Sequence, residues 1–274
     1  MPLHVFRVSA VVRESVPLVA WSGTFLASIV KGLMSSEEVR CGFFLSPLQL
    51  VSGRGLEVVL SGLLNGSSRS VVEAGSRAVF SVTLFCKEFP SNFLNSLGNG
   101  SAGPFTIQSV DYEYVDVFPG SRAEDFVNLV DAYSRGVVEV FFYPTILVFR
   151  GWRILYPSPQ RIVFNLLKQA TNLLNLDPRI AKRRARVLSR NVELIRDDTR
   201  TVAVNIGKRR TAKAFMGRAL FGVTGIENLR DFVDLLRFGA IVGVGKSRGI
   251  GFGFYRFRVL KPRNRKEPAY GEGE

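Results

Sequence analysis

A glycine-rich segment near the end of the chain holds the residues whose types and spacing most suggest chemistry. Residues 239–253 place six glycines and two cations, Lys246 and Arg248, between a helical apolar pattern and an alternating strand pattern. Because glycine has no side chain, the backbone N–H groups of such a segment can approach an anion closely. The sequence therefore predicts an anion-binding loop. We assign the binding to Gly243, Gly245, Lys246, Ser247, Arg248, Gly251 and Gly253.

The order of the flanking elements separates this loop from a nucleotide-hydrolysing P-loop. Residues 240–247 fit a relaxed Walker A pattern, but a P-loop needs a strand before it and a helix after it. Here the helical pattern comes first and the strand follows, so a P-loop NTPase is only a third hypothesis. A glycine-rich turn that serves close packing alone is a further alternative.

The charge of the chain favours a polyanionic partner. Its 274 residues carry 37 Lys and Arg against 23 Asp and Glu, a formal net charge of +14. Thirteen basic and three acidic residues fall within 179–218, so the charge forms a patch. We expect nucleic acid as the partner, and we assign RNA binding in this patch to four residues of a hairpin: Lys208, Arg209, Arg210 and Lys213.

Other classes of protein are disfavoured by what the sequence lacks. No run of about 18 uncharged apolar residues is present, so we expect no membrane span. Cys41 and Cys86 lie 45 residues apart and accompany a single histidine, His4. This composition excludes a structural zinc site and gives no sign of a disulfide framework, so we expect a protein of the reducing cytoplasm.

Two groups of polar residues could be interpreted as a catalytic histidine and a metal site, but the pattern around each favours a structural role. His4 shares the inward parity of Phe6 on a strand, which favours a packed or edge histidine over a catalytic one. Asp111, Glu113 and Asp116 alternate along another strand, as solvated acids commonly do. We therefore expect no metal ion and no cofactor.

The elements that must position these residues follow one order twice. The first half predicts strands at 3–13, 41–50, 77–85 and 105–117, helices at 24–34 and 88–97, and a hairpin arm at 56–64. The second half predicts strands at 137–149, two within 192–219 and one after the glycine loop, with helices at 160–174 and 227–238. The basic stretch 179–190 is compatible with a continued helix.

This repetition predicts an α+β protein built from two tandem ferredoxin-like units of the βαββαβ type. We place the units at residues 1–120 and 134–262, with a linker at 119–125, a short helical stretch reaching residue 133, and a tail at 263–274.

Several motifs together resemble a known family. They are Leu-Leu-Arg-Phe-Gly at 235–239, the glycine loop, Phe-Phe-Tyr-Pro-Thr at 141–145, Tyr-Pro-Ser-Pro at 156–159 and Phe-Phe-Leu-Ser-Pro-Leu at 43–48. With the two tandem units, they resemble the CRISPR-associated endoribonucleases of the RAMP superfamily that process repeat RNA. The resemblance implies metal-independent cleavage of CRISPR repeat transcripts, in which a ribose 2′-OH attacks the adjacent phosphorus and leaves a cyclic phosphate and a 5′-OH.

The family also suggests where cleavage would occur. Many members supply a tyrosine on the first helix, a histidine soon after it and a lysine before the next strand. Lys31 stands at the tyrosine's position, no histidine lies between Gly32 and Val39, and Arg40 precedes the strand. We assign catalysis to Lys31 and Arg40. A lysine can transfer a proton, whereas an arginine stays charged and can only stabilise or orient a phosphate.

The missing histidine keeps a second hypothesis open. In it, the protein is a non-catalytic RAMP subunit that holds repeat or guide RNA within an effector complex. The expected partners are CRISPR repeat RNA and subunits of such a complex, and the sequence leaves open whether the protein forms a homodimer.

Overall fold

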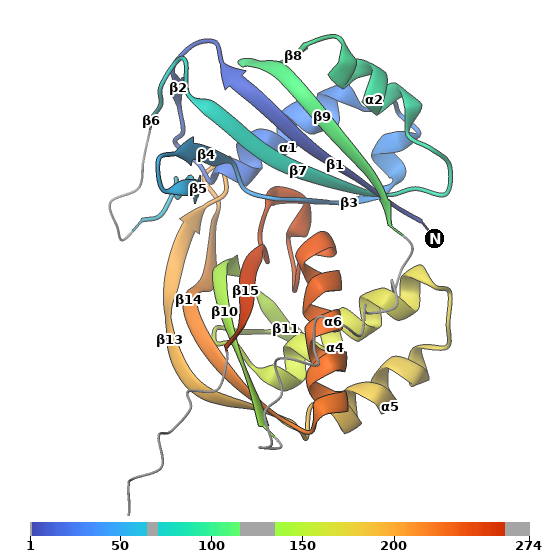
Figure 1. Cartoon of the computed structure of the whole chain (residues 1–274). Coiled ribbons are helices and arrows are strands. Elements are labelled where there is room, and N and C mark those ends of the chain that lie inside the picture. Colours follow the sequence, from blue (N-terminus) through green and yellow to red (C-terminus); the bar gives the residue numbers. More distant parts are fainter. Residues whose placement is uncertain (1, 65–70, 116–134, 261–274) are drawn as a thin grey trace, which may run out of the picture.

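The computed structural model describes residues 2–64, 71–115 and 135–260, which form an α+β fold with antiparallel sheets (Figure 1). In the N-terminal part, the main sheet has the order β5-β4-β7-β1-β9-β8, and β3 also pairs with β7. The strands are β1 (Leu3–Val12), β3 (Gly42–Leu45), β4 (Gln49–Ser52), β5 (Gly55–Val58), β7 (Arg77–Phe85), β8 (Ser101–Ala102) and β9 (Phe105–Val115). A smaller pair joins β2 (Val16–Pro17) and β6 (Val71–Val72). The helices α1 (Ser22–Leu33) and α2 (Ser91–Gly98) pack on one face of the main sheet.

The C-terminal part has a four-stranded sheet in the order β13-β14-β10-β15. Its strands are β10 (Arg135–Thr145), β13 (Val192–Asn205), β14 (Thr211–Thr224) and β15 (Tyr255–Leu260), and β11 (Leu147–Phe149) forms a separate pair with β12 (Trp152–Ile154). The helices α4 (Pro159–Leu173), α5 (Pro178–Leu188) and α6 (Ile226–Val242) lie on one side of the sheet (Figure 1).

Local sequence explains where these helices begin and which faces they bury. Pro159 and Pro178 stand at the first helical position, where a missing N–H costs nothing and the fixed φ suits a helix. Asp177 caps α5, because its side chain accepts a hydrogen bond from the backbone N–H of Arg179 at 2.8 Å. On α4, Ile162, Leu166 and other apolar residues at helical spacing are buried, so this face packs into the core.

The two parts share one core. Leu3, Val5 and Phe85 belong to the same apolar cluster as residues of α6 and β10. Across the same boundary, the Thr83 hydroxyl donates to the carbonyl of Ile241 at 2.7 Å. The N-terminal sheet therefore packs directly against the C-terminal part.

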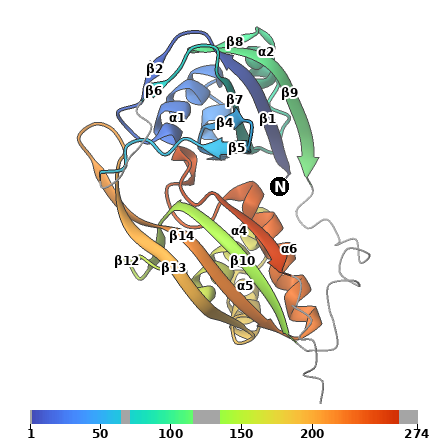
Figure 2. The same cartoon turned by 60° about the vertical axis from the view of Figure 1, so that its left-hand side comes forward.

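A second apolar cluster joins the parts at the beginning of α1. Trp21 is fully buried there with Phe252, which follows the glycine-rich segment, and with Val204 and Ala212 of the β13–β14 hairpin. The backbone N–H of Trp21 donates to the carbonyl of Asn205 at 2.8 Å. In Figure 2 the tip of this hairpin rises beside the N-terminal part.

The predicted elements differ from the observed ones in several places. The strand expected at 137–149 is divided at Ile146 into β10 and β11, which belong to different sheets, and the second strand expected within 192–219 continues to Thr224. The strand expected at 41–50 is divided into β3 and β4 around Pro47, which has no N–H to donate to a sheet. The arm expected at 56–64 is a strand only to Val58. The helix expected to end at 238 continues to Val242, so Gly239 lies within α6. A Cβ at Gly239 would fall 2.1 Å from the Tyr255 hydroxyl, which explains a glycine inside a helix.

A disulfide joins Cys41 to Cys86, with 5.3 Å between their Cα atoms, and this corrects the expectation from the sequence. The pairing arises from the sheet, because β3 runs beside β7 with Gly42 opposite Phe85. Cys41 directly precedes Gly42 and Cys86 directly follows Phe85, so this register brings the two cysteines together. Their separation of 45 residues in the sequence carried no sign of this.

Some expectations lie outside the described residues, namely the linker at 119–125, the helical stretch to residue 133 and the tail. Within the described ranges, no helix is long and apolar enough to cross a membrane.

Candidate nucleic-acid interface

The glycine-rich loop occupies the boundary between the two parts of the protein. It follows α6, enters a short 3-10 helix (Arg248–Ile250) and leads into β15. The helix, loop and strand therefore follow in the predicted order. The 3-10 helix lies against α1 and β3, and a Cβ at Gly23 of α1 would fall 2.2 Å from the carbonyl oxygen of Ile250.

The backbone N–H groups of Lys246 and of four loop glycines are used within the protein. Lys246 donates to the carbonyl of Ile146 at 2.8 Å, Gly253 donates to Pro144 at 3.0 Å, and Gly245 donates to the side-chain oxygen of Asn165 at 2.8 Å. The N–H groups of Gly243 and Gly251 likewise reach the carbonyls of Gly239 and Arg248. These five N–H groups are therefore already hydrogen-bonded within the protein.

Close packing explains why glycine occupies these positions. A Cβ would fall 1.8 Å from the carbonyl oxygen of Val244 at Gly253, 2.2 Å from that of Ile146 at Gly245 and 2.6 Å from the Phe44 ring at Gly243. At Gly251 it would fall 3.2 Å from the backbone nitrogen of Pro47. All four also have positive φ, which glycine adopts at little cost. The glycines thus let the loop fit between β10 and the N-terminal sheet.

The two cations of the loop have different surroundings. Arg248 donates to the carbonyl of Val242 at 2.9 Å and to the side-chain oxygen of Gln169, and its guanidinium lies 5.8 Å from the centre of the Phe85 ring. Burial lowers the pKa of Arg248. Its guanidinium therefore links α4, α6 and β7. Lys246 and Ser247, in contrast, are exposed at the tip of the loop.

Lys31 lies beside this loop. It is exposed in the last turn of α1, and its Nζ is 6.0 Å from the centre of the Phe43 ring. The 3-10 helix also approaches this ring, because a Cβ at Gly249 would fall 3.4 Å from it. The structure thus brings Lys31 and the glycine loop to one aromatic side chain.

Arg40 is exposed at the end of a 3-10 helix (Glu38–Arg40), on the far side of a tight turn from Lys31. Glu38 fixes this turn from within. Its buried carboxylate accepts hydrogen bonds from the backbone N–H groups of Ser35 at 2.9 Å and Phe93 at 3.1 Å. Arg40 is also anchored through its neighbour Cys41, which forms the disulfide.

The four hairpin cations are exposed where the β13–β14 hairpin approaches α1. Lys208 and Arg209 have positive φ values in the turn, and the N–H of Arg210 donates to the carbonyl of Gly207 at 3.0 Å. Lys213 follows on β14. A Cβ at Gly207 would lie 3.8 Å from the methyl group of Thr24. The basic hairpin and the glycine loop thus contact the same helix.

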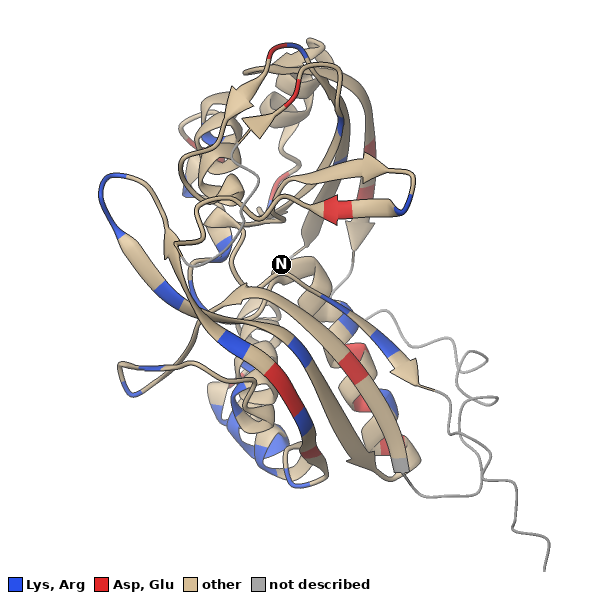
Figure 3. Ribbon diagram, turned by 90° about the vertical axis from the view of Figure 1, so that its left-hand side faces the viewer, with Lys and Arg blue, Asp and Glu red and all other residues tan. Residues whose placement is uncertain are grey.

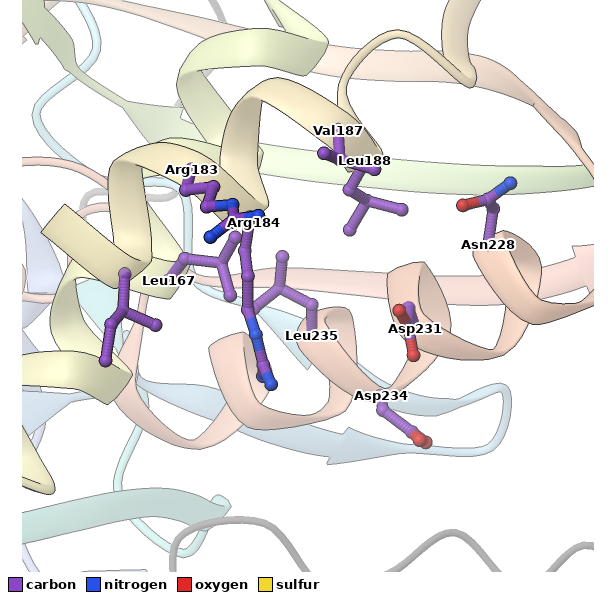
Figure 4. A pocket seen from close by; sticks show the side chains of 10 residues that line it. Leu167, Arg183, Arg184, Val187, Leu188, Asn228, Asp231, Asp234 and Leu235 are labelled. Atoms are coloured by element: carbon purple, nitrogen blue, oxygen red, sulfur yellow. The ribbon is translucent and has the colours of Figure 1, made fainter. Parts of the chain in front are cut away.

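The other part of the basic patch is a separate helix. Most of the cations of α5 are exposed, and Figure 3 shows them on the same side of the molecule as the tip of the β13–β14 hairpin. A cavity of about 610 Å³ lies between α4, α5 and α6, with Arg183 and Arg184 facing Asp231 and Asp234 across apolar side chains (Figure 4). Burial raises the pKa of Asp231. None of the predicted site residues lines this cavity.

The acids singled out in the sequence are surface residues of β9. Glu113 forms an ion pair with Arg7 at 3.3 Å, Asp111 lies opposite Arg7 in the sheet register, and Asp116 lies outside the described ranges. Among the residues that the structure describes, no three potential ligands are grouped as a metal ion would require.

His4 is packed, as its parity predicted. Its side chain is 3% exposed, and Nδ1 lies 3.0 Å from the Tyr112 hydroxyl within a group of rings that includes Phe89 and Tyr114. Burial lowers the pKa of His4 below 6.5, so the folded protein favours the neutral imidazole.

This burial predicts a pH-dependent stability. The unfolded chain binds a proton at His4 more readily than the folded chain, so the stability that neutral His4 contributes is present above about pH 6.5 and is lost as the pH falls below it. His4→Phe should remove that loss, because phenylalanine does not titrate. Urea denaturation of both proteins at pH 8 and pH 5.5 measures it. Parallel losses in the two proteins would contradict the prediction.

Comparisons with known proteins give a match to a family model over part of the chain and a shared fold over most of it. Residues 140–255 match the family model described as CRISPR-associated endoribonuclease Cas6. The sequence has no match among the curated proteins.

Solved structures extend the likeness over most of the chain. The "Cas6 (TTHB231) product complex" is 15% identical with a TM-score of 0.59, and the match covers 94% of this chain and 100% of that one. Thermus thermophilus Cas6 (TTHB231) is 16% identical with a TM-score of 0.58, covering 94% and 98%. A chain of a "Partial Cas6-RT-Cas1--Cas2 complex" is 10% identical with a TM-score of 0.62, covering 94% and 46%. The family model thus matches residues 140–255 of this chain, and the solved structures show that the chain shares the fold of Cas6 proteins.

Proposed function

We propose that this protein cleaves CRISPR repeat transcripts once per repeat without a metal ion, by attack of a ribose 2′-OH on the adjacent phosphorus. The observation that carries the proposal is the meeting of three exposed cationic elements around α1. Lys31 stands on the helix, Lys246 on the glycine loop that packs against it, and Lys208 to Arg210 on the hairpin that approaches its first turn. An RNA strand that follows α1 would contact all three.

The reaction needs a group that moves a proton and cations that stabilise the charge on the pentavalent phosphorus. Lys31 supplies the ammonium that protonates the departing 5′-oxygen, while the proton of the attacking 2′-OH passes to solvent water, which afterwards returns a proton to Lys31. Arg40 supplies a planar guanidinium that can hold two phosphate oxygens at once. The turn fixed by Glu38 sets the position of Arg40 relative to Lys31. Lys246 and Ser247 contact the RNA backbone on either side of the cleaved phosphate. Arg248 and the loop glycines hold Lys246 and Ser247 in position.

The same proposal includes the architecture. We interpret the order β1-α1-β3-β7-α2-β9 as one ferredoxin-like unit and β10-α4-β13-β14-α6-β15 as the second, with the boundaries near residues 120 and 134 predicted above. A cytoplasmic site of action follows from the RNA substrate.

Cleavage of a labelled repeat RNA in EDTA tests the function. The wild-type protein should cut at one position and leave a 2′,3′-cyclic phosphate. A single 2′-deoxy substitution should block cleavage only at the nucleotide that supplies the attacking hydroxyl. Cleavage that requires a divalent ion, or that persists through every 2′-deoxy substitution, would contradict this chemistry.

A non-catalytic subunit that binds repeat or guide RNA is the second candidate. It is favoured by the absence of a histidine between Gly32 and Val39 and by the burial of His4 away from α1. Tight repeat binding without cleavage of any cognate repeat would support it. Some solved relatives are titled as assemblies with RT, Cas1 and Cas2, so co-purified partners should be sought.

The hairpin cations should make RNA binding strongly dependent on salt. Each phosphate that a lysine or arginine neutralises releases counterions, so replacing Lys208, Arg209 and Arg210 together with alanine should lower repeat affinity. The slope of log K against log salt should fall by about 2 to 3 in magnitude. A filter-binding series from low to moderate salt measures the slope. As a control, replacing Arg179, Lys182 and Arg183 of α5 with alanine removes the same charge far from the β13–β14 hairpin. An equal loss of affinity and slope in this variant would mean that net charge, and not the hairpin, determines binding.

A further inference from the structure

The β11–β12 hairpin carries an aromatic surface that the proposed function has not used. Phe149 and Trp152 are opposite each other in its register, so their side chains project from the same face at its tip. Trp152 is 79% exposed, more than any other aromatic side chain in the described ranges. An indole held in water on a short, tight hairpin suggests a binding role, because tryptophan usually buries most of its surface.

Cations surround these rings. The Arg161 guanidinium lies 3.5 Å from the centre of the Phe149 ring, and that of Arg150 lies 5.2 Å from it. Arg153 is exposed on β12. Residues 140–176 contain four cations and no acid. Arg161 thus covers one face of the Phe149 ring. The exposed Trp152 ring can still stack with a ligand, and Arg150 and Arg153 are its neighbours in the hairpin.

The hairpin is attached to the candidate RNA interface. Ile146, directly before β11, accepts the hydrogen bond from the backbone N–H of Lys246. Ile146 and Val148 pack in the same apolar cluster as Val204 and Ala212 of the basic hairpin. A strand bound by Lys246 and the β13–β14 hairpin would therefore pass close to β11 and β12.

We propose that Trp152 stacks on an unpaired base of the bound RNA while Arg150 and Arg153 contact its phosphates. Stacking needs an unpaired base, because bases inside a duplex already cover each other's faces. The combination of an open ring, neighbouring arginines and no acid favours nucleic acid, because single-stranded nucleic acid offers a base to the ring and phosphates to the cations at each nucleotide. The proposal deepens the proposed function and rests on it for the choice of RNA.

The chain is suited to a direct test, because it has two tryptophans and Trp21 is fully buried. Titration with a repeat RNA made uncleavable by 2′-deoxy substitution should quench the Trp152 emission. Trp152→Ala should weaken binding by about 5- to 150-fold, as expected for one stacked base. Trp152→Phe should restore most of the affinity without the fluorescence change. Tyr114→Ala removes a 55% exposed ring on β9 and should leave affinity within about 2-fold.

Abasic sites identify the base. At one unpaired position, removal of the base should weaken wild-type binding as much as Trp152→Ala does, and the two changes together should add little. If the repeat binds but Trp152→Ala keeps full affinity and the emission is unchanged, stacking is wrong while the proposed cleavage stands. Loss of self-association in Trp152→Ala with unchanged RNA affinity would instead overturn the proposal in favour of protein docking. If single-stranded RNA quenches the Trp152 emission but the protein never cuts a repeat, the stacking proposal stands and the cleavage proposal fails.

Discussion

Lys31→Ala should lower the single-turnover rate of repeat cleavage by about 10- to 1000-fold, the range expected for loss of a proton-transfer group or its charge. Repeat affinity should change much less, because Lys246 and the hairpin cations still hold the RNA. Lys31→Arg should recover little of the rate, since a guanidinium keeps the charge but does not release a proton. Arg40→Lys should be partly tolerated, since an ammonium keeps the charge but lacks the paired donors. Quenched-flow cleavage with enzyme in excess separates the chemical step from product release.

Two controls define this result. Lys168→Ala removes an exposed lysine from α4 and should leave the rate near that of the wild type. His4→Ala should do the same in protein that remains folded, because His4 lies on the inner strand β1 and packs among aromatic rings. If His4→Ala abolished cleavage and Lys31→Ala preserved it, the assignment of Lys31 would be wrong.

Gly253→Ala should destabilise the protein by about 2–5 kcal/mol, combining about 1–2 kcal/mol for the left-handed backbone with about 1–3 kcal/mol for displaced neighbours. At this position φ is +76° and a Cβ would lie 1.8 Å from the carbonyl oxygen of Val244. RNA binding should fall with it, since the loop carries Lys246. Urea denaturation gives the change in the free energy of unfolding.

Gly75 provides a matched control for backbone strain alone. Its φ is +79°, but a Cβ there would meet nothing within 4 Å, so Gly75→Ala should cost only about 1–2 kcal/mol. The difference between the two changes in the free energy of unfolding gives the cost of the steric clash at Gly253. Equal losses would mean that the close approach of Val244 and Gly253 has no energetic importance.

The elements with strong periodicity could be predicted from the sequence. The strand at 77–85 was predicted at its observed bounds, because alternating apolar residues reflect a sheet buried on one side. The helices covering the second sheet were also expected within a few residues. The division of 41–50 at Pro47 and the extension of α6 through Gly239 depended on neighbours distant in the sequence, so local patterns could not predict them.

The candidate site was harder to predict for the same reason. Glycine spacing indicated a loop, but the partners of its N–H groups lie on β10 and α4, and only the fold places them there. The same limit applied to Arg248, whose side chain looked like a phosphate ligand and is instead held by Gln169 and Val242. The aromatic and basic residues at 149–153 could have indicated a binding surface from the sequence alone. The structure adds that the Trp152 ring is exposed.

The burial of Trp21 has a consequence for synthesis of the chain. Its ring is covered by Phe252, with ring centres 6.0 Å apart, and by residues of the β13–β14 hairpin. Translation adds about 5–20 residues per second, so about 10 to 50 seconds pass between the synthesis of Trp21 and that of Phe252. During that interval the beginning of α1 lacks its covering partners. The nascent N-terminal part therefore emerges from the ribosome with an uncovered indole and reaches its final packing only after Phe252 has been synthesised.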